Sequence, residues 1–562
     1  MRITGIIRGP RRVRRVAHIA RKLASHGLGF LVGKMNLQRY LPAKMRIPSK
    51  GGVSEPSELP SRLASVLEEL GPTFVKFGQM LSTRPDVLPE EYIEELQRIT
   101  HHVHPFPGRT ARRIVEEELE APVDELFEEF NNEPRASGSI AQVHEARLPD
   151  GTEVVVKVVR PGIEDTIEDD LSIMQFMAAR MDRVEEIKNL RPRMLVDEFG
   201  RLIRGELNLL NEAANTHRLR EELADNDRLV VPTVYWDYSS RRVLTLRKLE
   251  GELLAQADLE EMPAERRRGL AGTLMETFLD QIFRLGLFHA DPHAGNIVLL
   301  GGNRVGLIDM GQIGRITESM RGHISMGVVA LSNAQMELAA EIVGEIGSLP
   351  VGSSSEDFRG EIAGLLDRYQ GTPVSRLDLG RAFNDAMAVV RRYGVVMPRD
   401  FVLLGKTLGT VSGVVMDLAP DLKVEKLARD YAGSIVKQRL SPTSIKKAIT
   451  RYIYHISNLL RDGPAELREI FRKIHRGQLE FTIRHEGFNE AVAELDRTGN
   501  RLSLSIILAA IIMASASLLT AKAGPTVNLL GWQASVLGFS GLMFGLILGA
   551  WLIIGIFRSG RL

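Results

Sequence analysis

A short segment of the sequence contains the residue types of a phosphoryl-transfer site. Asp291 lies in His-Ala-Asp-Pro-His-Ala-Gly-Asn, which ends at Asn296, and Asp309 follows in Ile-Asp-Met-Gly after an apolar run and a Gly-Gly-Asn turn. Phosphoryl transfer requires a carboxylate that orients or deprotonates the acceptor, and oxygen ligands that hold Mg²⁺ on the phosphates. We predict that Asp291 is the catalytic base, and that Asn296 and Asp309 bind Mg²⁺.

The two histidines of this segment, His289 and His293, allow a second interpretation, a metal site with histidine and aspartate ligands. Their spacing is not that of a helical His-Glu-x-x-His site, and such a site leaves Asp309 without a role. A polar turn without chemistry is the third interpretation. The kinase-like interpretation is favoured because the base, the amide and the second carboxylate occur in the order that it requires.

A candidate phosphate-binding region precedes this segment. The β-branched run around Lys157 is joined by a Pro-Asp-Gly turn to the run 140–143, which predicts a β-hairpin. A lysine in such a strand contacts the α- and β-phosphates in kinases, although a lysine beside an apolar strand often only extends into solvent. Small residues just upstream allow backbone N–H groups to approach phosphates, and the sequence has no Gly-x-Gly-x-x-Gly there. We predict a nucleotide site with these residues: Ala136, Ser137, Gly138, Ser139, Gln142, Val143 and Lys157.

Glu206 is a further candidate for this site. It lies on the predicted helical stretch 206–215 and can form an ion pair with Lys157, which is the role of the αC glutamate in a kinase. A solvent-facing glutamate is the alternative, and spacing alone leaves both open.

The pattern of elements predicts an α+β protein with a protein-kinase-like, two-lobed fold. Helical periodicity dominates 56–130, a hairpin follows at 140–159, another helical stretch spans 164–224, and short strands lie near 229–235 and 242–246. The chain is then mostly helical to about 500, with a short β pattern at 297–315. The predicted domains are a basic N-terminal segment (1–55), a helical extension (56–120), an N-lobe (121–250), a helical C-lobe (251–500) and a transmembrane hairpin (501–562).

Charge is distributed unevenly along the 562 residues, although the formal net charge is only +1. Residues 1–50 contain no acid, and the arginines of 11–15 alternate with Val13, Val16, Ile19 and Leu23 at helical spacing. We predict an amphipathic helix on an anionic membrane surface; a disordered basic arm or a nucleic-acid tail is the alternative. We expect no nucleic-acid partner. The absence of cysteine excludes disulfides and thiolate chemistry.

Two uncharged runs near the C-terminus, 502–521 and 536–557, predict a transmembrane helix hairpin. Arginines flank both outer ends, whereas the connecting loop holds only Lys522, so the positive-inside rule places the large domain in the cytoplasm. Gly541, Gly545 and Gly549 form a smooth face for close packing, within the hairpin or in a homodimer. A pair of buried core helices is the alternative.

Together these motifs resemble the UbiB/AarF family of atypical kinases, also called the AarF-domain-containing kinases. The family's KxGQ motif corresponds to Lys76-Phe-Gly-Gln79, its alanine-rich loop to 136–139, and its ExD segment to 206–208; HADPHAGN and IDMG complete the set. The resemblance extends from about residue 60 to the C-terminal hairpin. Asn208 stands where the family has an acid, and Gly138 where many members have alanine.

The resemblance implies a kinase-like fold whose KxGQ extension covers the pocket where a protein substrate would bind. Lys76 and Gln79 would then reach the active site as catalytic residues, and Glu206 would pair with Lys157. It also implies ATP and Mg²⁺ as cofactors, ATPase activity more readily than protein phosphorylation, and a role in isoprenoid quinone biosynthesis. Membrane lipids and quinone precursors or quinone-biosynthesis proteins are the implied partners, at the inner (cytoplasmic) membrane.

Two other functions stay open at this point. A small-molecule or lipid kinase shares the His-x-Asp-x-x-x-x-Asn pattern, but such enzymes are not expected to have the KxGQ extension. A nucleotide-binding pseudokinase scaffold would not need to retain Lys157, Asp291, Asn296 and Asp309 together.

Overall fold

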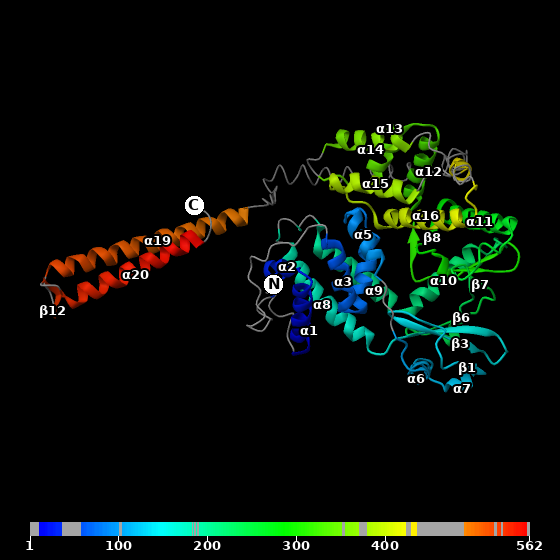
Figure 1. Ribbon diagram of the computed structural model, residues 1–562, viewed down its shortest axis with the longest axis horizontal. Helices are drawn as coiled ribbons and strands as arrows, with labels where there is room; N and C mark the ends of the chain where they lie inside the picture. Colours follow the sequence, from blue (N-terminus) through cyan, green and yellow to red (C-terminus); the bar gives the residue numbers. More distant parts are fainter. Residues whose placement is uncertain are drawn as a thin grey trace, which may run out of the picture. The chain divides into compact units, whose positions relative to one another are not determined.

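The computed structural model describes residues 10–35, 37, 58–99, 104–182, 184, 187, 190–350, 354–369, 379–422, 429–434, 488–521, 525–529 and 532–558. The chain divides into two compact units, Met1–Ala448 and Ile449–Leu562. The first unit contains every candidate site residue, and the second contains the apolar helices near the C-terminus (Figure 1).

Five helices open the first unit: α1 (Pro10–Ser25), α2 (Gly29–Lys34), α3 (Leu59–Leu70), α4 (Pro72–Ser82) and α5 (Glu90–Gln97). The helices α3 and α4 are separated at Gly71, whose φ of 97° lies in a region that suits glycine, and Pro72 then begins α4. The Lys-x-Gly-Gln motif therefore lies within a helix, where Lys76 and Gln79 are three positions apart and share a face.

The helix predicted over the basic N-terminal residues is confirmed as α1, but its predicted membrane face is wrong. Val16, Ile19 and Leu23 are buried in a core cluster that also contains residues of α3 and of α8 (Ile163–Met181). Two arginines attach the helix to α8: Arg12 Nε lies 2.8 Å from Asp169, and Arg15 Nε lies 2.8 Å from Asp170. The apolar stripe therefore packs against protein. Residues 1–9 lie outside the described part.

The predicted hairpin at 140–159 is confirmed as β3 (Ala141–Arg147) and β4 (Glu153–Val159). They pair antiparallel in a sheet of order β1-β3-β4-β6, with β2 (Ala136–Ser137) also on β3. The other strands are β1 (Glu129–Phe130) and β6 (Val243–Arg247). Val154, Val156 and Val158 face a cluster formed with α6 (Gly108–Leu119) and α7 (Val123–Leu126). Because side chains alternate along a strand, Lys157 projects from the opposite face.

That opposite face packs against helices that the sequence places within 164–224. These are α8, α9 (Pro192–Glu206) and α10 (Leu209–Glu222). Leu209 and Ala213 of α10 share a core cluster with Leu244 and Leu246 of β6. The sheet and α10 together fix the position of the lysine.

After β6, the described residues of the first unit are mostly helical, as predicted. A four-stranded sheet has the order β5-β10-β9-β7, and β8 (Leu287–His289) pairs with β11 (Ile313–Arg315). The strands of the larger sheet are β5 (Leu229–Val230), β7 (Glu252–Leu253), β9 (Ile297–Leu299) and β10 (Val305–Leu307). The helices are α11 (Ala264–Leu279), α12 (Glu318–Ser332), α13 (Met336–Ile346), α14 (Ser355–Tyr369), α15 (Leu379–Arg392) and α16 (Arg399–Leu418).

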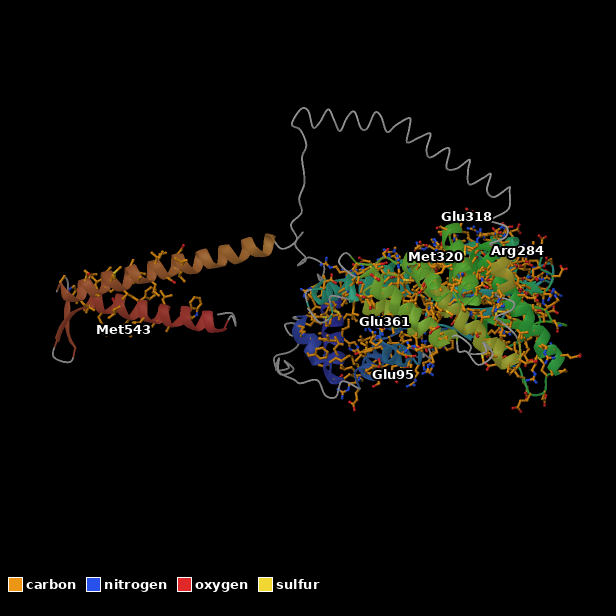
Figure 2. All side chains as sticks on the ribbon, turned by 90° about the horizontal axis from the view of Figure 1, so that it is seen from above. Glu95, Arg284, Glu318, Met320, Glu361 and Met543 are labelled. Carbon is orange, nitrogen blue, oxygen red and sulfur yellow. The ribbon has the colours of Figure 1, made fainter. Side chains whose placement is uncertain are left out.

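The second unit contains two long helices that pack along each other, α19 (Phe488–Thr520) and α20 (Val536–Arg558), joined through the antiparallel strands β12 (Thr526–Leu529) and β13 (Trp532–Ser535). The side chains in Figure 2 include Met543 of α20. A Cβ added at Gly541 would lie 2.4 Å from Ser515 Oγ, and one at Gly545 would lie 2.9 Å from Ile512. The glycine face is therefore used for packing between these two helices.

Two described helices are long and apolar enough to cross a membrane. In one, Leu502–Leu519 of α19, only 6% of the segment is buried. The other is α16, half of which is buried in the core around α11 and the catalytic segment. The apolar composition of α16 is thus accounted for by its place in the core.

Candidate active site

Lys157 forms an ion pair with Glu212 at the face of the first sheet. Its Nζ lies 2.9 and 2.8 Å from the two carboxylate oxygens of Glu212, and 3.6 Å from Asp309 Oδ2. The lysine side chain is 22% exposed and the glutamate 8%. Burial alone would lower the pKa of Lys157, but the charges of Asp309 and Glu212 raise it above its ordinary value. Lys157 therefore stays charged, as a phosphate contact requires.

The prediction that Glu206 pairs with Lys157 is wrong. Glu206 is the last residue of α9, and its Oε2 lies 2.9 Å from Nζ of Lys76 on α4. Burial by itself lowers the pKa of Lys76, but the Glu206 carboxylate raises it overall. The partner of Lys157 lies one helix further on, in the first turn of α10. Each glutamate thus compensates a different lysine.

Asn208, the residue that departs from the ExD pattern, has a structural role between these two glutamates. It is the N-cap of α10, and its side-chain oxygen accepts a hydrogen bond from the backbone N–H of Leu210 at 3.2 Å. Asparagine and aspartate are about equally good N-caps, so the change of residue preserves the start of the helix. The start of α10 in turn fixes Glu212.

Asp309 lies in a conformation unusual for a residue with a side chain, with φ of 60°. Its Oδ1 accepts a hydrogen bond from Gly311 N at 3.1 Å. The charge of Lys157, together with this hydrogen bond, lowers the pKa of Asp309 to about 2. The side chain is 51% exposed. An ionised, accessible carboxylate results.

The segment 289–296 is organised around the fully buried His289. Its Nδ1 accepts a hydrogen bond from Asp291 N at 3.0 Å, and its backbone N–H donates to Gln281 Oε1 at 2.9 Å. Burial lowers the pKa of His289, so the ring is neutral. In the part of the chain that the structure describes, no group of three or more metal-ligating His, Asp or Glu side chains occurs. The geometry therefore gives His289 a supporting role and no support to the histidine–metal interpretation.

Asn296 and Asp309 line one small cavity of about 190 Å³, together with Lys157 and Asp291. Asn296 Nδ2 donates to the backbone carbonyl of Asp291 at 3.0 Å, so its side-chain oxygen is the remaining donor atom for a ligand. Carboxylate and amide oxygens are the donors Mg²⁺ prefers, and on nucleotides it needs only one or two protein ligands beside phosphates and waters. The two residues fit that requirement.

The predicted phosphate loop is divided between lining and supporting residues. Gly138 and Ser139 line the small cavity, whereas Ala136, Ser137, Gln142 and Val143 are not among its lining residues. The Gln142 side chain is buried and bonds both backbone groups of Phe106, at 3.1 and 3.2 Å. For Gln142 the predicted nucleotide contact is therefore replaced by a structural one.

Arg160 stabilises the predicted phosphate loop through hydrogen bonds to Ser137 and Gly138. It donates from Nε to the carbonyl of Gly138 at 2.9 Å and from a terminal nitrogen to Ser137 Oγ at 2.6 Å. Gly138 N also donates to Ala141 O at 2.8 Å, which closes the turn. These bonds fix the turn that carries Gly138 and Ser139.

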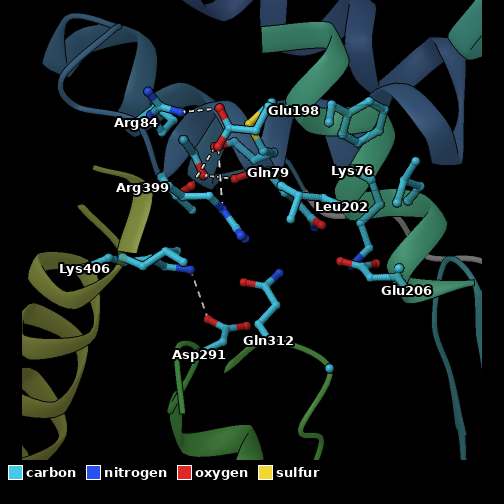
Figure 3. A pocket seen from close by; sticks show the side chains of 18 of the residues that line it. Lys76, Gln79, Arg84, Glu198, Leu202, Glu206, Asp291, Gln312, Arg399 and Lys406 are labelled. Carbon is cyan, nitrogen blue, oxygen red and sulfur yellow. Dashed lines mark hydrogen bonds and ion pairs between the residues drawn. The ribbon is translucent and has the colours of Figure 1, made fainter. Parts of the chain in front are cut away.

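A larger hollow of about 710 Å³ adjoins the catalytic segment (Figure 3). Lys76 and Gln79 of α4 line it on one side and Asp291 on another, which places the KxGQ helix beside the Asp291 carboxylate. Its wall includes apolar side chains of α5, α9 and α16, and one just after α5: Leu96, Ile99, Phe199, Leu202, Ile203, Val402 and Leu403. The hollow is therefore amphipathic.

Sequence reasoning missed two groups around this hollow. Lys406 of α16 lies 3.0 Å from Asp291 Oδ1. It is the one charged residue between Asp400 and Asp417 in an otherwise apolar stretch, which is a signal for a partnered group. Arg84, which is 4% exposed, bonds Asp86 at 2.8 Å through two nitrogens and Glu198 at 2.6 Å through the third. These bonds link the residues that follow α4 to Glu198 of α9.

Comparisons with known proteins identify related domains and relatives of this chain. Residues 98–343 match the ABC1 atypical kinase-like domain, 362–423 the UbiB helical domain, and 486–558 the ABC1/UbiB kinase-like C-terminal domain. The chain is 34% identical to the "Probable protein kinase UbiB" of Marinobacter nauticus, over 76% of this chain and 78% of that protein. For the protein of that name from Aeromonas salmonicida the identity is 33%, over 82% and 85%.

A solved structure, the Rv3197–erythromycin complex from Mycobacterium tuberculosis, is 25% identical with a TM-score of 0.47. The match covers 63% of this chain and 90% of the chain in that structure. The identity to the curated relatives over most of their length, together with the three matched domains, shows that this chain belongs to the UbiB family of atypical kinase-like proteins.

Proposed function

We propose that the protein is an ATP-dependent atypical kinase or ATPase, anchored in the cytoplasmic membrane, that supports isoprenoid quinone biosynthesis. The observation that carries this proposal is the arrangement around Lys157: a buried ion pair to Glu212 with Asp309 at 3.6 Å. Phosphoryl transfer depends on positioning and on fixed charges, and kinases need this lysine–glutamate pair and the metal-binding aspartate together. The sheet of β3 and β4 and the sheet of β9 and β10, each with its surrounding helices, are proposed to form the two lobes of the kinase-like fold.

The residues have distinct roles in this proposal. Lys157 contacts the α- and β-phosphates, and the backbone of Gly138 and Ser139 lies over the phosphate chain. Asn296 and Asp309 hold Mg²⁺, which neutralises phosphate charge when bound. Asp291 accepts the proton of the acceptor hydroxyl or of water. Its position is supported by its backbone bonds to His289 and Asn296, at 3.0 Å each.

The acceptor is proposed to be a small amphipathic molecule or water, and not a protein segment. The supporting observation is that α4, through Lys76 and Gln79, forms part of the wall of the 710 Å³ hollow next to Asp291. That volume is within the range of small-molecule pockets, and its wall mixes apolar side chains with a few polar ones. Quinone precursors have this character. A pseudokinase scaffold is the alternative that the experiment below excludes or establishes.

Membrane anchoring is proposed for the second unit alone. At 1.5 Å per residue, the apolar segments Leu502–Leu519 and Val536–Trp551 cross most of a bilayer core of about 30 Å. Large side chains such as Ile507 and Trp551 are more than half exposed in the structure, so these helices need an apolar surrounding. The positive charges at the outer ends support a hairpin with both ends in the cytoplasm.

The test is ATP turnover by the full chain in lipid nanodiscs, with and without Mg²⁺. Asp291→Asn and Asp309→Asn are compared with Asp124→Asn, which changes an 86% exposed aspartate that pairs with Arg112 on the surface. We expect both site variants to abolish Mg²⁺-dependent turnover and Asp124→Asn to keep it. Nucleotide binding without turnover under any condition, with acidic lipids or a phenolic quinone mimic added, would establish the scaffold instead.

A further inference from the structure

Helix α16 carries a lysine, Lys406, on the face that meets the segment 289–296. None of the sequence motifs described above includes this lysine. Lys406 Nζ lies 3.0 Å from Asp291 Oδ1, and its side chain is 32% exposed to the large hollow. The next residue, Thr407, donates from Oγ1 to the carbonyl of Ala290 at 3.2 Å. Two adjacent residues thus fix α16 against the catalytic aspartate, and the dashed line in Figure 3 marks the lysine contact.

The segment 289–296 contains no lysine or arginine and so supplies no permanent positive charge beside Asp291. Of its two histidines, His289 is buried and neutral. His293 Nδ1 accepts a hydrogen bond from Gly295 N at 3.1 Å. Its Nε2 lies 3.9 Å from Asp291 Oδ2. A permanent positive charge at the acceptor side of Asp291 therefore has to come from another element, and α16 provides it.

The ammonium of Lys406 has N–H donors beyond the one that bonds Asp291. A lysine ammonium has three N–H donors, and within the part of the chain that the structure describes only Asp291 accepts a bond from this one. Val402 and Leu403, one turn earlier on the same helix, are buried at the wall of the hollow, and Thr410, one turn later, also lines it. The helix thus holds the lysine at the edge of the core with its ammonium facing the hollow.

We propose that Lys406 is a catalytic residue that binds the phosphoryl group during its transfer. The inference rests on the function proposed above, with ATP as donor and a hydroxyl or water as acceptor. The bond between the γ-phosphorus and the β,γ-bridging oxygen breaks, a bond from the acceptor oxygen to that phosphorus forms, and the acceptor proton passes to Asp291. The free N–H groups of Lys406 donate to the non-bridging oxygens of the transferred group. The negative charge of the metaphosphate-like transition state is spread over these oxygens.

The position of Lys406 predicts a separation between turnover and nucleotide binding. Lys406 lines the large hollow but not the small cavity of Lys157, Asn296 and Asp309. Its donors are therefore used in the transition state and not in the ground-state complex with nucleotide. Removing one preorganised donor of this kind lowers kcat by roughly 10²–10³-fold. We expect a fall of about 10²-fold in kcat for Lys406→Met and a change of less than about threefold in the Kd for Mg²⁺-ATP, because the binding residues are unchanged.

The experiment uses the full chain in nanodiscs and measures kcat, the Kd of a fluorescent ATP analogue and the melting temperature. Lys406→Met is compared with Lys406→Arg, which keeps the charge, and with Lys248→Met. Lys248 is a matched control, since it is 25% exposed and pairs with Glu145 and Glu153 away from the site. We expect Lys406→Arg to recover at least tenfold of the lost kcat and Lys248→Met to retain wild-type kcat.

The outcomes are distinguishable. Wild-type turnover that persists in Lys406→Met, or increases, overturns the inference while the proposed function stands. A parallel loss of kcat, nucleotide binding and melting temperature that Lys406→Arg does not recover also overturns it, because it shows a structural role. Absence of turnover in the wild type, with nucleotide still bound, refutes the proposed function and this inference with it. If Lys406→Met does not fold, Lys406→Gln replaces it and the same criteria apply.

Discussion

The two glutamates near the site make different pairs, and exchanging each for glutamine separates their roles. Glu212→Gln removes the negative charge opposite Lys157, whereas Glu206→Gln removes the one opposite Lys76. Glutamine has nearly the same shape as glutamate, so helix packing and the N-cap at Asn208 are kept. The comparison therefore tests which carboxylate positions the phosphate-binding lysine.

The magnitude follows from the bonds that are lost. Lys157 makes two charge-assisted hydrogen bonds to Glu212, at 2.9 and 2.8 Å, and Glu212→Gln retains at most one acceptor without charge. A hydrogen bond to a charged group contributes about 1.5–3 kcal/mol. Each 1.36 kcal/mol is a factor of ten, so we expect kcat/KM for ATP to fall by roughly 10–100-fold. In addition, Lys157 becomes free to move from 3.6 Å toward Asp309 and to compete with Mg²⁺.

The assay is steady-state ATP hydrolysis by the full chain in nanodiscs, over a range of ATP and Mg²⁺ concentrations. Glu206→Gln breaks the Lys76–Glu206 pair but leaves the Lys157–Glu212 pair intact. We therefore expect kcat/KM to fall by less than about fivefold for Glu206→Gln. The Mg²⁺ concentration for half-maximal rate is expected to rise only for Glu212→Gln. A larger loss for Glu206→Gln than for Glu212→Gln would refute the pairing on which the site is built.

Three further predictions concern the parts that hold or tune the site. Replacing the buried Arg84 by methionine leaves Asp86 without its partner and Glu198 with only Arg399 at 3.6 Å, and is expected to lower the free energy of unfolding by about 3–5 kcal/mol in chemical denaturation. Arg135→Met, which breaks a half-exposed pair with Glu145, should cost at most about 1 kcal/mol, and equal effects would contradict the argument. Since the pKa of Asp309 is lowered to about 2, its carboxylate stays ionised until the pH falls through that value. Mg²⁺-dependent binding of an ATP analogue by the wild type should therefore show no loss centred at pH 4–5. A loss there that is present in the wild type and absent in Asp309→Asn would contradict this. In this chain without cysteine, Ile512→Cys with Gly545→Cys should form an intramolecular disulfide in lipid, while Ile512→Cys with the outward-facing Ile547→Cys should not, and the reverse result would contradict the packing of α19 on α20.

The catalytic segment and the sheet could be predicted from the sequence because their signals are local. The run around Lys157 alternates between a buried face and a face toward α10, and β pairing with 141–147 follows from the turn at 149–151. The order of Asp291, Asn296 and Asp309 likewise defines a unit that folds within about twenty residues, as a loop with β9 and β10. These features require no knowledge of distant contacts.

The partner of Lys157 could not be predicted because it depends on where two helices meet the sheet. Glu206 and Glu212 are six positions apart, on either side of the Asn208 cap, and each follows helical residues. Only the packing of α10 against β6 and of α9 against α4 decides which carboxylate reaches which lysine. The burial of Val16 and Ile19 is a similar case, because an amphipathic stripe predicts an apolar contact but does not say whether lipid or α8 supplies it.

The charges of the site explain why the two glutamates are separated in this way. Lys76 and Lys157 face Glu206, Glu212 and Asp309, so two cations meet three carboxylates and one negative charge is left over. Glu206 and Glu212 each lie within 2.9 Å of one lysine, and Asp309 is the carboxylate that remains 51% exposed. A carboxylate neutralised by its own lysine would be a weaker metal ligand, since Mg²⁺ would have to compete with that cation. The Glu212 carboxylate therefore holds Lys157 and leaves Asp309 for the metal, while Glu206 neutralises Lys76 separately.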